Sequence, residues 1–78
     1  MKRTNGKTRF AVCLNNDDYE ASLELGKIYQ VLPDAKAARH GLTRVIDESG
    51  EDYLYPADWF HAVKLPSAVQ QVLVDAAS

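Results

Sequence analysis

Hydrophobic and polar residues alternate over several short stretches of this chain, and turn-forming residues separate the stretches. In the first of them, Phe10, Val12 and Leu14 occupy every second position. A period of two is typical of a half-buried β-strand and not of a helix. The same pattern recurs along the chain, and it predicts five short strands over residues 8–15, 27–33, 42–46, 52–55 and 60–65.

The third and fourth of these strands form a tight hairpin whose register follows from its turn. Asp47 and Gly50 stand at the first and fourth positions of a type I turn closed by a glycine in the left-handed region. Glycine suits that position because a side chain is strained at positive φ. The register expected from this turn pairs Ile46 with Asp52, Val45 with Tyr53, Arg44 with Leu54 and Thr43 with Tyr55.

The charged side chains of the hairpin predict structural roles. Arg44 lies diagonal to Asp52 in this register, so we expect a cross-strand ion pair. Asp47 and Glu51 flank the turn, and we expect both carboxylates to be solvated. The turn acids also lack the alternating spacing of a calcium-binding loop, so the sequence predicts no metal site at Asp47, Glu48, Glu51 or Asp52.

The remaining segments predict connections, one helix and a small core. We expect a long polar loop over residues 16–26, with Leu23 and Leu25 returning to the core. One helical turn is expected over residues 34–41 and a 3₁₀ turn over residues 56–59. Ser67 and Gln70 match a capping box at the start of a C-terminal helix. Its apolar face consists of Val69, Val72, Leu73 and Ala76. The expected core consists of Val12, Ile28, Val31, Val45, Tyr55 and Phe60.

These elements predict one domain, since the chain has only 78 residues. We expect a flexible basic arm over residues 1–7, the strands over residues 8–65, and a helix over residues 66–78 that packs on them. The chain carries a net charge of −2, yet residues 1–10 contain four basic residues and no acid. A nucleic-acid-associated protein that uses this basic arm is therefore the alternative function.

Composition narrows the cellular setting. The single cysteine, Cys13, excludes an internal disulfide and is typical of a reducing compartment. No apolar run reaches the roughly 18 residues that a membrane span requires. The N-terminus has positive charge without an apolar segment behind it, which is not typical of a secretion signal. We therefore expect a cytoplasmic protein that does not enter a membrane.

Two segments carry a resemblance to SH3 domains. The segment YLYPADWF, residues 53–60, resembles the part of those domains where an apolar strand residue precedes Pro, two small or polar residues and an aromatic residue. The segment LELGKIYQV, residues 23–31, resembles the strand that opens with a glycine after the long loop. The resemblance implies a mainly β fold, a five-stranded SH3-like barrel with a short C-terminal α-helix. The chain also resembles short uncharacterised bacterial proteins that share a GEDYLYP core.

The same resemblance implies where a ligand would bind. Pro56 and Trp59 match the proline and aromatic positions that line the peptide groove of SH3 domains. Tyr19 lies where another groove aromatic or an acidic specificity residue is expected. We expect Tyr19 and Tyr53 to be neighbours of Pro56 and Trp59. The acidic residues of the long loop match the acidic loop that meets a basic residue of the ligand. Leu42 stands where SH3 domains carry a groove tryptophan. The binding residues expected are Trp59, Pro56, Tyr19, Tyr53, Asp17 and Asp18.

No pattern in the sequence predicts catalysis. Cys13, His40 and His61 are not surrounded by a nucleophile signature, and they are too few for a structural zinc site. The four glycines are scattered and form no phosphate-binding loop. We therefore expect no catalytic residue, no metal and no cofactor. The predicted function is binding of a protein or peptide by a monomer or weak homodimer.

Overall fold

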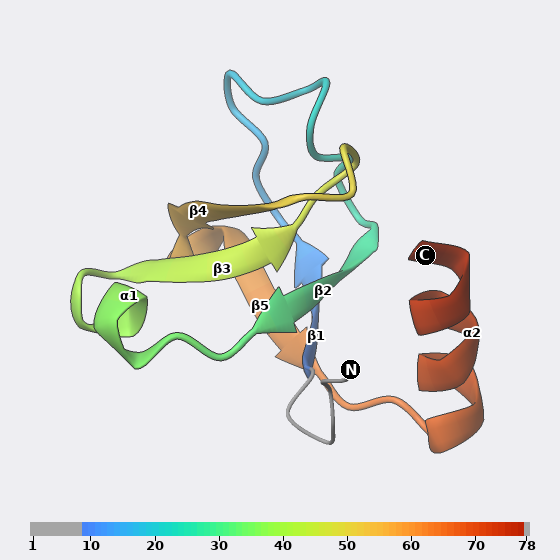
Figure 1. The fold of residues 1–78 in the computed structure, drawn as a ribbon. Coiled ribbons are helices and arrows are strands. Elements are labelled where there is room, and N and C mark those ends of the chain that lie inside the picture. The colour runs from blue at the N-terminus through green and yellow to red at the C-terminus, as the bar shows by residue number, and fades with distance from the viewer. Residues whose placement is uncertain (1–8, 78) are drawn as a thin grey trace.

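The computed structural model describes residues 9–77, and they form one antiparallel sheet with three short helical segments (Figure 1). Both the sheet and the C-terminal helix were predicted from the sequence. The elements are β1 (Arg9–Cys13), β2 (Ile28–Leu32), α1 (Ala35–Arg39), β3 (Leu42–Ile46), β4 (Asp52–Pro56), η1 (Ala57–Trp59), β5 (Phe60–Val63) and α2 (Ser67–Ala77). The basic arm predicted over residues 1–7 lies outside the described residues.

The five strands lie in the order β4-β3-β2-β1-β5. Every neighbouring pair is antiparallel. Strands β3 and β4 run nearly across the direction of β1 in Figure 1, so the sheet is strongly twisted. Within residues 9–77 no strand pairing joins β4 to β5. The mainly β prediction is therefore confirmed, whereas the ladder itself is open and not closed into a barrel.

The β3–β4 hairpin has the predicted register. Val45 lies opposite Tyr53, and Thr43 lies opposite Tyr55. Gly50 has a φ of 84°, and its N–H donates to the Asp47 carbonyl at 3.0 Å. Turn chemistry is local, so the sequence alone was sufficient to set this register.

The predicted ion pair of Arg44 is also present, in a larger network. The guanidinium lies 2.8 Å from Asp52 and 2.8 Å from Asp34. Asp34 caps α1 as well, because its carboxylate accepts the Ala37 N–H at 2.9 Å. Arg44 therefore connects the short helix α1 to strands β3 and β4.

The central core cluster lies on the face of β1 that the alternation did not select, although Phe10 on the predicted face is also buried. Cys13 is 1% exposed, whereas Leu14 is 58% exposed and Val12 is only partly buried. The prediction of Val12 and Ile28 as core residues was wrong, because these two lie opposite each other on the other face of the sheet. Both faces of β1 carry apolar side chains, so polarity could not choose between them.

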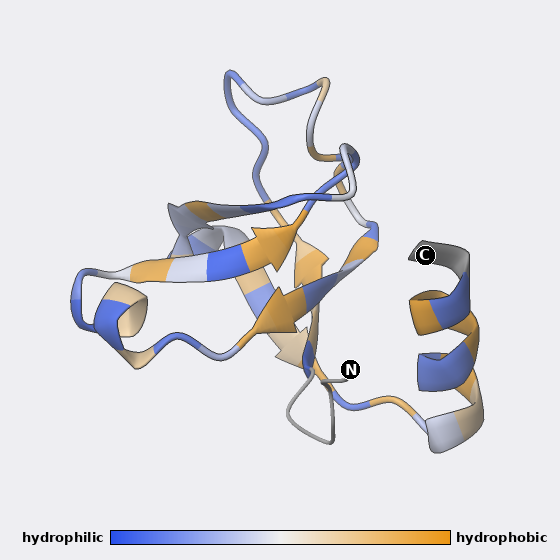
Figure 2. Cartoon of the chain, in the orientation of Figure 1, coloured by the Kyte–Doolittle hydropathy of each residue, from blue (hydrophilic) through white to orange (hydrophobic). Residues whose placement is uncertain are grey.

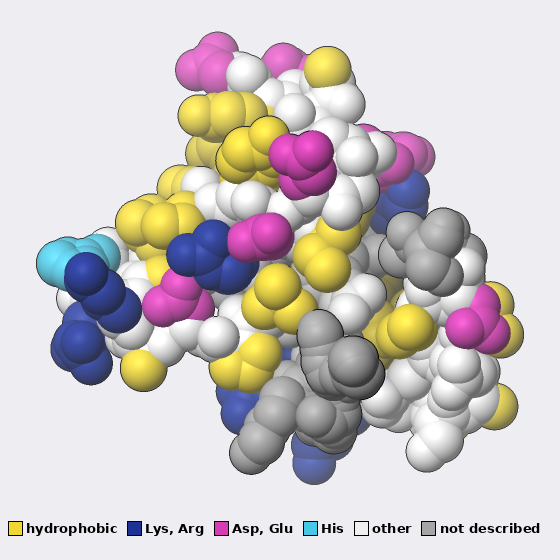
Figure 3. Space-filling view, viewed as in Figure 1, with side chains coloured by type: hydrophobic (Ala, Val, Ile, Leu, Met, Phe, Trp, Pro, Cys, Tyr) yellow, Lys and Arg dark blue, Asp and Glu magenta, His cyan; other side chains and the backbone are white. Residues whose placement is uncertain are grey.

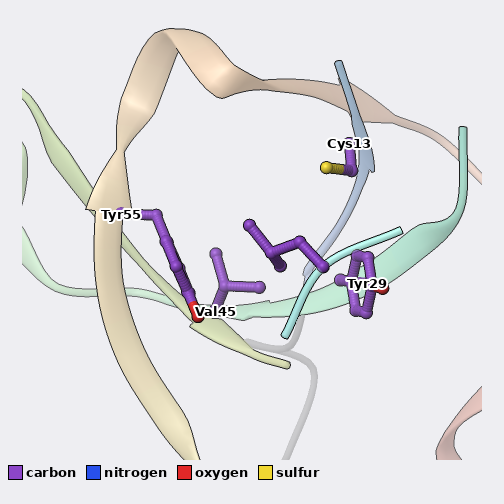
Figure 4. Packing of buried hydrophobic residues seen from close by; sticks show 5 residues of the cluster. Cys13, Tyr29, Val45 and Tyr55 are labelled. Atoms are coloured by element: carbon purple, nitrogen blue, oxygen red, sulfur yellow. The ribbon is translucent and has the colours of Figure 1, made fainter. Parts of the chain in front are cut away.

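The core cluster combines strand residues with one loop residue (Figure 4). Val45 and Tyr55 were predicted core residues and are buried. Phe60 and Val31 were also predicted there, and they pack against the cluster while only partly buried. The fully buried Leu23 comes from the long loop. The cluster consists of Cys13, Leu23, Tyr29, Val45 and Tyr55.

Helix α2 lies beside the other face of the sheet, and hydrophobic residues alternate with polar ones along it (Figures 1 and 2). Leu73 lines a hollow of about 250 Å³ together with Phe10, Ile28 and Ile46. The helix begins at Ser67, and Gln70 does not form the predicted capping box. Instead its side-chain amide donates to the Leu65 carbonyl at 2.7 Å. No helix within residues 9–77 is long and apolar enough to span a membrane.

Candidate functional site

Three aromatic rings from separate segments meet at one side of the core. Tyr19 comes from the loop between β1 and β2, Tyr55 from β4 and Trp59 from η1. The ring centroid of Tyr19 lies 5.3 Å from that of Tyr55 and 5.8 Å from that of Trp59. The rings of Tyr55 and Trp59 are stacked with centroids 6.3 Å apart. The structure therefore brings two of the predicted binding residues, Tyr19 and Trp59, into contact.

The long loop holds Tyr19 in place because its far end is anchored. Leu23 is buried in the core, and its carbonyl accepts the side-chain amide of Asn16 at 2.9 Å. The Glu48 N–H donates to the Ser22 carbonyl at 3.0 Å, which joins the loop to the β3–β4 turn. The loop thus packs against the rest of the domain and does not extend freely into solvent.

A hollow of about 330 Å³ lies between this loop and the hairpin, and we call it the tyrosine hollow. Its walls are partly solvent-exposed, with Tyr19 47% and Tyr53 50% exposed. Hydrophobic and acidic side chains adjoin one another across this upper part of the molecule (Figure 3). The residues that line the tyrosine hollow are Tyr19, Ser22, Asp47, Ser49, Tyr53, Leu54 and Tyr55.

Asp47 is buried, and the prediction of a solvated turn acid was wrong for it. The residue as a whole is only 6% exposed. One carboxylate oxygen accepts the Ser49 N–H at 2.9 Å and the Ser49 hydroxyl at 2.6 Å. The other accepts the Tyr55 hydroxyl at 2.6 Å. These three hydrogen bonds replace the water that the carboxylate loses on burial.

The Asp47 carboxyl is ionised in this setting. Burial raises its pKa, but the hydrogen bonds from Ser49 and Tyr55 outweigh burial and leave the pKa below its usual value. For Tyr55, burial and the adjacent Asp47 carboxylate raise the pKa to about 12. The tyrosine therefore stays protonated and remains a donor to Asp47 near neutral pH.

A second tyrosine–carboxylate pair, Tyr29 and Glu48, lies next to the same loop and hairpin turn. The Tyr29 hydroxyl donates to Glu48 and accepts the Glu24 N–H at 2.8 Å. Burial, followed by the Glu48 carboxylate, raises the pKa of Tyr29. The Lys27 ammonium lies 2.6 Å from Glu48 and 5.4 Å from the centre of the Tyr29 ring. These contacts link the loop, β2 and the hairpin turn.

The other predicted binding residues adjoin members of this cluster along the chain. Pro56 ends β4, is partly buried and precedes the η1 turn that carries Trp59. Trp59 is itself partly buried and packs against the core. The exposed Asp17 and Asp18 lie in the loop before Tyr19, and Asp18 has a φ of 69°.

The sequence predicted two of the aromatic residues that line the tyrosine hollow and missed its polar residues. Tyr19 was predicted from the resemblance and Tyr53 as a neighbour of Pro56 and Trp59, whereas Ser22 and Asp47 were not predicted. An aspartate followed two residues later by serine is a known local turn signal, so the Asp47–Ser49 bond could have been found. Leu23 was expected to return to the core and is buried, whereas Leu25, expected there too, is 58% exposed. No pattern indicated that the burial of Leu23 would bring Ser22 to the hairpin turn.

Comparison of the chain with protein-family models, curated proteins and solved structures found no match. Within residues 9–77 no group of three or more His, Cys, Asp and Glu side chains is arranged to hold a metal ion. The candidate site thus consists of exposed aromatic rings, one buried carboxylate and an acidic loop.

Proposed function

We propose that this protein is a small SH3-like domain that binds a protein or peptide through the surface formed by Tyr19, Tyr53, Pro56 and Trp59. We call this the aromatic surface. The observation that carries the proposal is that the rings of Tyr19, Tyr55 and Trp59 contact one another, while Tyr19, Tyr53 and Tyr55 line the tyrosine hollow. The strand order and the 3₁₀ turn directly before the last strand support the SH3-like comparison.

The energetics of binding favour such a surface. Tyr and Trp are the residues that most often contribute large parts of the free energy of association, since each buries much area with few rotatable bonds. Tyr19 and Tyr53 leave about half of their surface available, at 47% and 50% exposure. The anchored loop already holds Tyr19 against Trp59, so a ligand would order little of the chain on binding.

The charge of the surrounding loop selects the kind of ligand. Asp17, Asp18 and Glu20 are exposed beside Tyr19. Their negative potential would accelerate the approach of a basic segment and disfavour an acidic one. A protein or peptide segment with basic and apolar residues is therefore the ligand proposed.

The test is affinity capture from cell lysate with the full chain, run with and without nuclease. The Tyr53→Ala variant is the sharpest comparison, because Tyr53 is half exposed and lies outside the core cluster. We expect a partner that survives nuclease and is lost with Tyr53→Ala. Val72→Ala, a change at a 65% exposed position of α2, should retain it. Trp59→Ala should also lose the partner, but Trp59 packs on the core, so this variant needs a check of folding.

A different outcome would favour the alternative function. Capture that disappears with nuclease and is unaffected by Tyr53→Ala would reject the aromatic surface as the binding site. Nucleic acid bound through the basic residues 1–9 would then be the better proposal, and its affinity should fall steeply with salt. Most of that segment lies outside the described residues, so the nucleic-acid alternative stays a prediction from sequence.

A further inference from the structure

The two strands that end the sheet, β4 and β5, have complementary outer edges. Neither pairs with a further strand within residues 9–77. An unpaired edge presents backbone N–H and C=O groups that a strand of another chain can use. We propose that β4 of one copy pairs antiparallel with β5 of a second copy of this chain. This self-association goes beyond the proposed function and does not depend on it.

The hydrogen bonds of the hairpin show which groups of β4 face outward. The Ala57 N–H donates to the Gly41 carbonyl at 2.8 Å. Because bonded and non-bonded positions alternate in an antiparallel pair, the odd-numbered residues of β4 bond to β3. The backbone groups of Asp52, Leu54 and Pro56 therefore face away from β3, and the proline has no N–H to offer.

The outer edge of β5 is defined in the same way. The Leu14 N–H donates to the Trp59 carbonyl at 2.7 Å, so the odd-numbered residues of β5 bond to β1. Ala62 therefore faces outward, and this residue is exposed and has only a methyl side chain. Phe60 faces outward as well, but its N–H already donates to the Ala57 carbonyl.

One antiparallel register uses the outward groups of both edges. It places Leu54 opposite Ala62 of the second copy. Asp52 then lies opposite Lys64 of the second copy, the residue that directly follows β5. In each of these two pairs, both residues donate one backbone hydrogen bond and accept the other.

The end of this ladder also matches. Pro56 lies opposite Phe60 of the second copy, where neither residue has a free N–H, so the pairing stops without leaving a donor unsatisfied. The smallest shift that keeps the outward groups facing each other is two residues. It would place Asp52 opposite Ala62 or Pro66 and lose its contact with Lys64.

The charges across the ladder are complementary. The Asp52 side chain contacts Arg44 but remains 44% exposed, and Lys64 is exposed. Opposite charges directly across an antiparallel pair stabilise it. Arg9 and Lys64 line the same hollow of about 610 Å³ beside β5, and no acidic residue of the described chain lines it. The β5 edge is thus suited to an acidic strand such as β4.

Pairing of two β4 edges is less favourable. It would place the acidic residues Glu51 and Asp52 of both copies along one short ladder, where like charges destabilise the pair. Asp52 would also lie opposite Pro56, which has no N–H for the Asp52 carbonyl. The contact between β4 and β5 joins two different surfaces, so it leads to a ring or a filament of copies.

Sedimentation velocity of the full chain over a concentration series at low salt measures this association. We expect species larger than the monomer to form as the concentration rises. Asp52→Lys and Lys64→Asp should each raise the dissociation constant at least about fivefold, because each places like charges opposite each other. An equimolar mixture of the two variants should restore association, because every contact between unlike copies again joins opposite charges.

Ala62→Pro tests the backbone contact. It removes an N–H that faces away from β1, so the variant should remain folded, as circular dichroism checks, and should associate more weakly. Val72→Ala should associate like the wild type. A monomer at every concentration, an unaffected Lys64→Asp, or a mixture of charge variants that fails to associate would overturn the proposal. Capture of a partner through Tyr53 is measured separately, and its result does not change with any of these outcomes.

Discussion

The side chain of Asp47 is both buried and ionised, two properties that normally conflict. It is buried, which disfavours a charge, yet three hydrogen bonds from Ser49 and Tyr55 favour the ionised form. The hydrogen bonds win, so the pKa of the carboxyl lies below its ordinary value. The same group fixes the turn and orients Tyr55. One residue therefore connects the hairpin turn to the ring of Tyr55, which packs against Tyr19 and Trp59.

This residue predicts a dependence of stability on pH. A carboxyl whose pKa is lower in the folded state than in the unfolded state stabilises the fold above about pH 4, and this stabilisation is lost as the pH falls through the folded-state pKa. Asp47→Asn should lower the free energy of unfolding by about 1–3 kcal/mol at neutral pH. The difference from the wild type should shrink towards pH 2. Urea unfolding at a series of pH values measures both quantities.

Tyr55→Phe is the matched control for this experiment. It removes the hydroxyl that donates to Asp47 but keeps the ring that packs against Tyr19 and Trp59. Its loss of stability should also be larger at neutral pH than in acid. A difference between Asp47→Asn and wild type that stays constant from neutral to acidic pH would show that Asp47 is not preferentially ionised in the folded state.

At the scale of elements, the sequence was most informative where structure is decided locally. The β3–β4 register followed from Asp47 and Gly50, and the turn over residues 57–59 followed from Pro56. The prediction that Val12 lies in the core was wrong. Both faces of β1 carry buried apolar residues, Phe10 on one and Cys13 on the other, so the alternation could not identify the face of the central cluster. The capping box was also wrong, since Gln70 bonds to the carbonyl before the helix instead.

The hairpin gives a prediction at this scale. Gly50 has a φ of 84°, and a side chain there would meet no atom within 4 Å. The effect of Gly50→Ala is therefore backbone strain alone, and it should lower the free energy of unfolding by about 1–2 kcal/mol. Gly50→Asn should be milder, because asparagine tolerates the left-handed region better. Thermal unfolding followed by circular dichroism ranks the two variants, and equal stability of Gly50→Ala and wild type would contradict the strained-turn account.

At the scale of the whole molecule, the site arises from contacts between distant segments. Tyr19 and Tyr53 could be named from a resemblance, but the hollow between them exists because Leu23 buries the loop beside the hairpin turn. The sequence predicted that Leu23 returns to the core, but no pattern indicated that its burial would bring the loop against the hairpin turn. The position of α2 beside the sheet also depends on contacts between distant segments. Its apolar face was predicted, yet only the structure places Leu73 beside Phe10.

The attachment of α2 predicts a contrast between two neighbouring helix positions. Leu73 is partly buried and shares a hollow with Phe10 and Ile28, whereas Val72 is 65% exposed. Leu73→Ala removes apolar contact with the sheet and should lower the free energy of unfolding by about 1–2 kcal/mol, less than a fully buried leucine would. Val72→Ala should change it by less than about 0.5 kcal/mol. Urea unfolding of the two variants measures the contrast. Equal effects would mean that α2 does not stabilise the sheet, and the helix would then be available to a partner, because a helix of this length is marginal without packing.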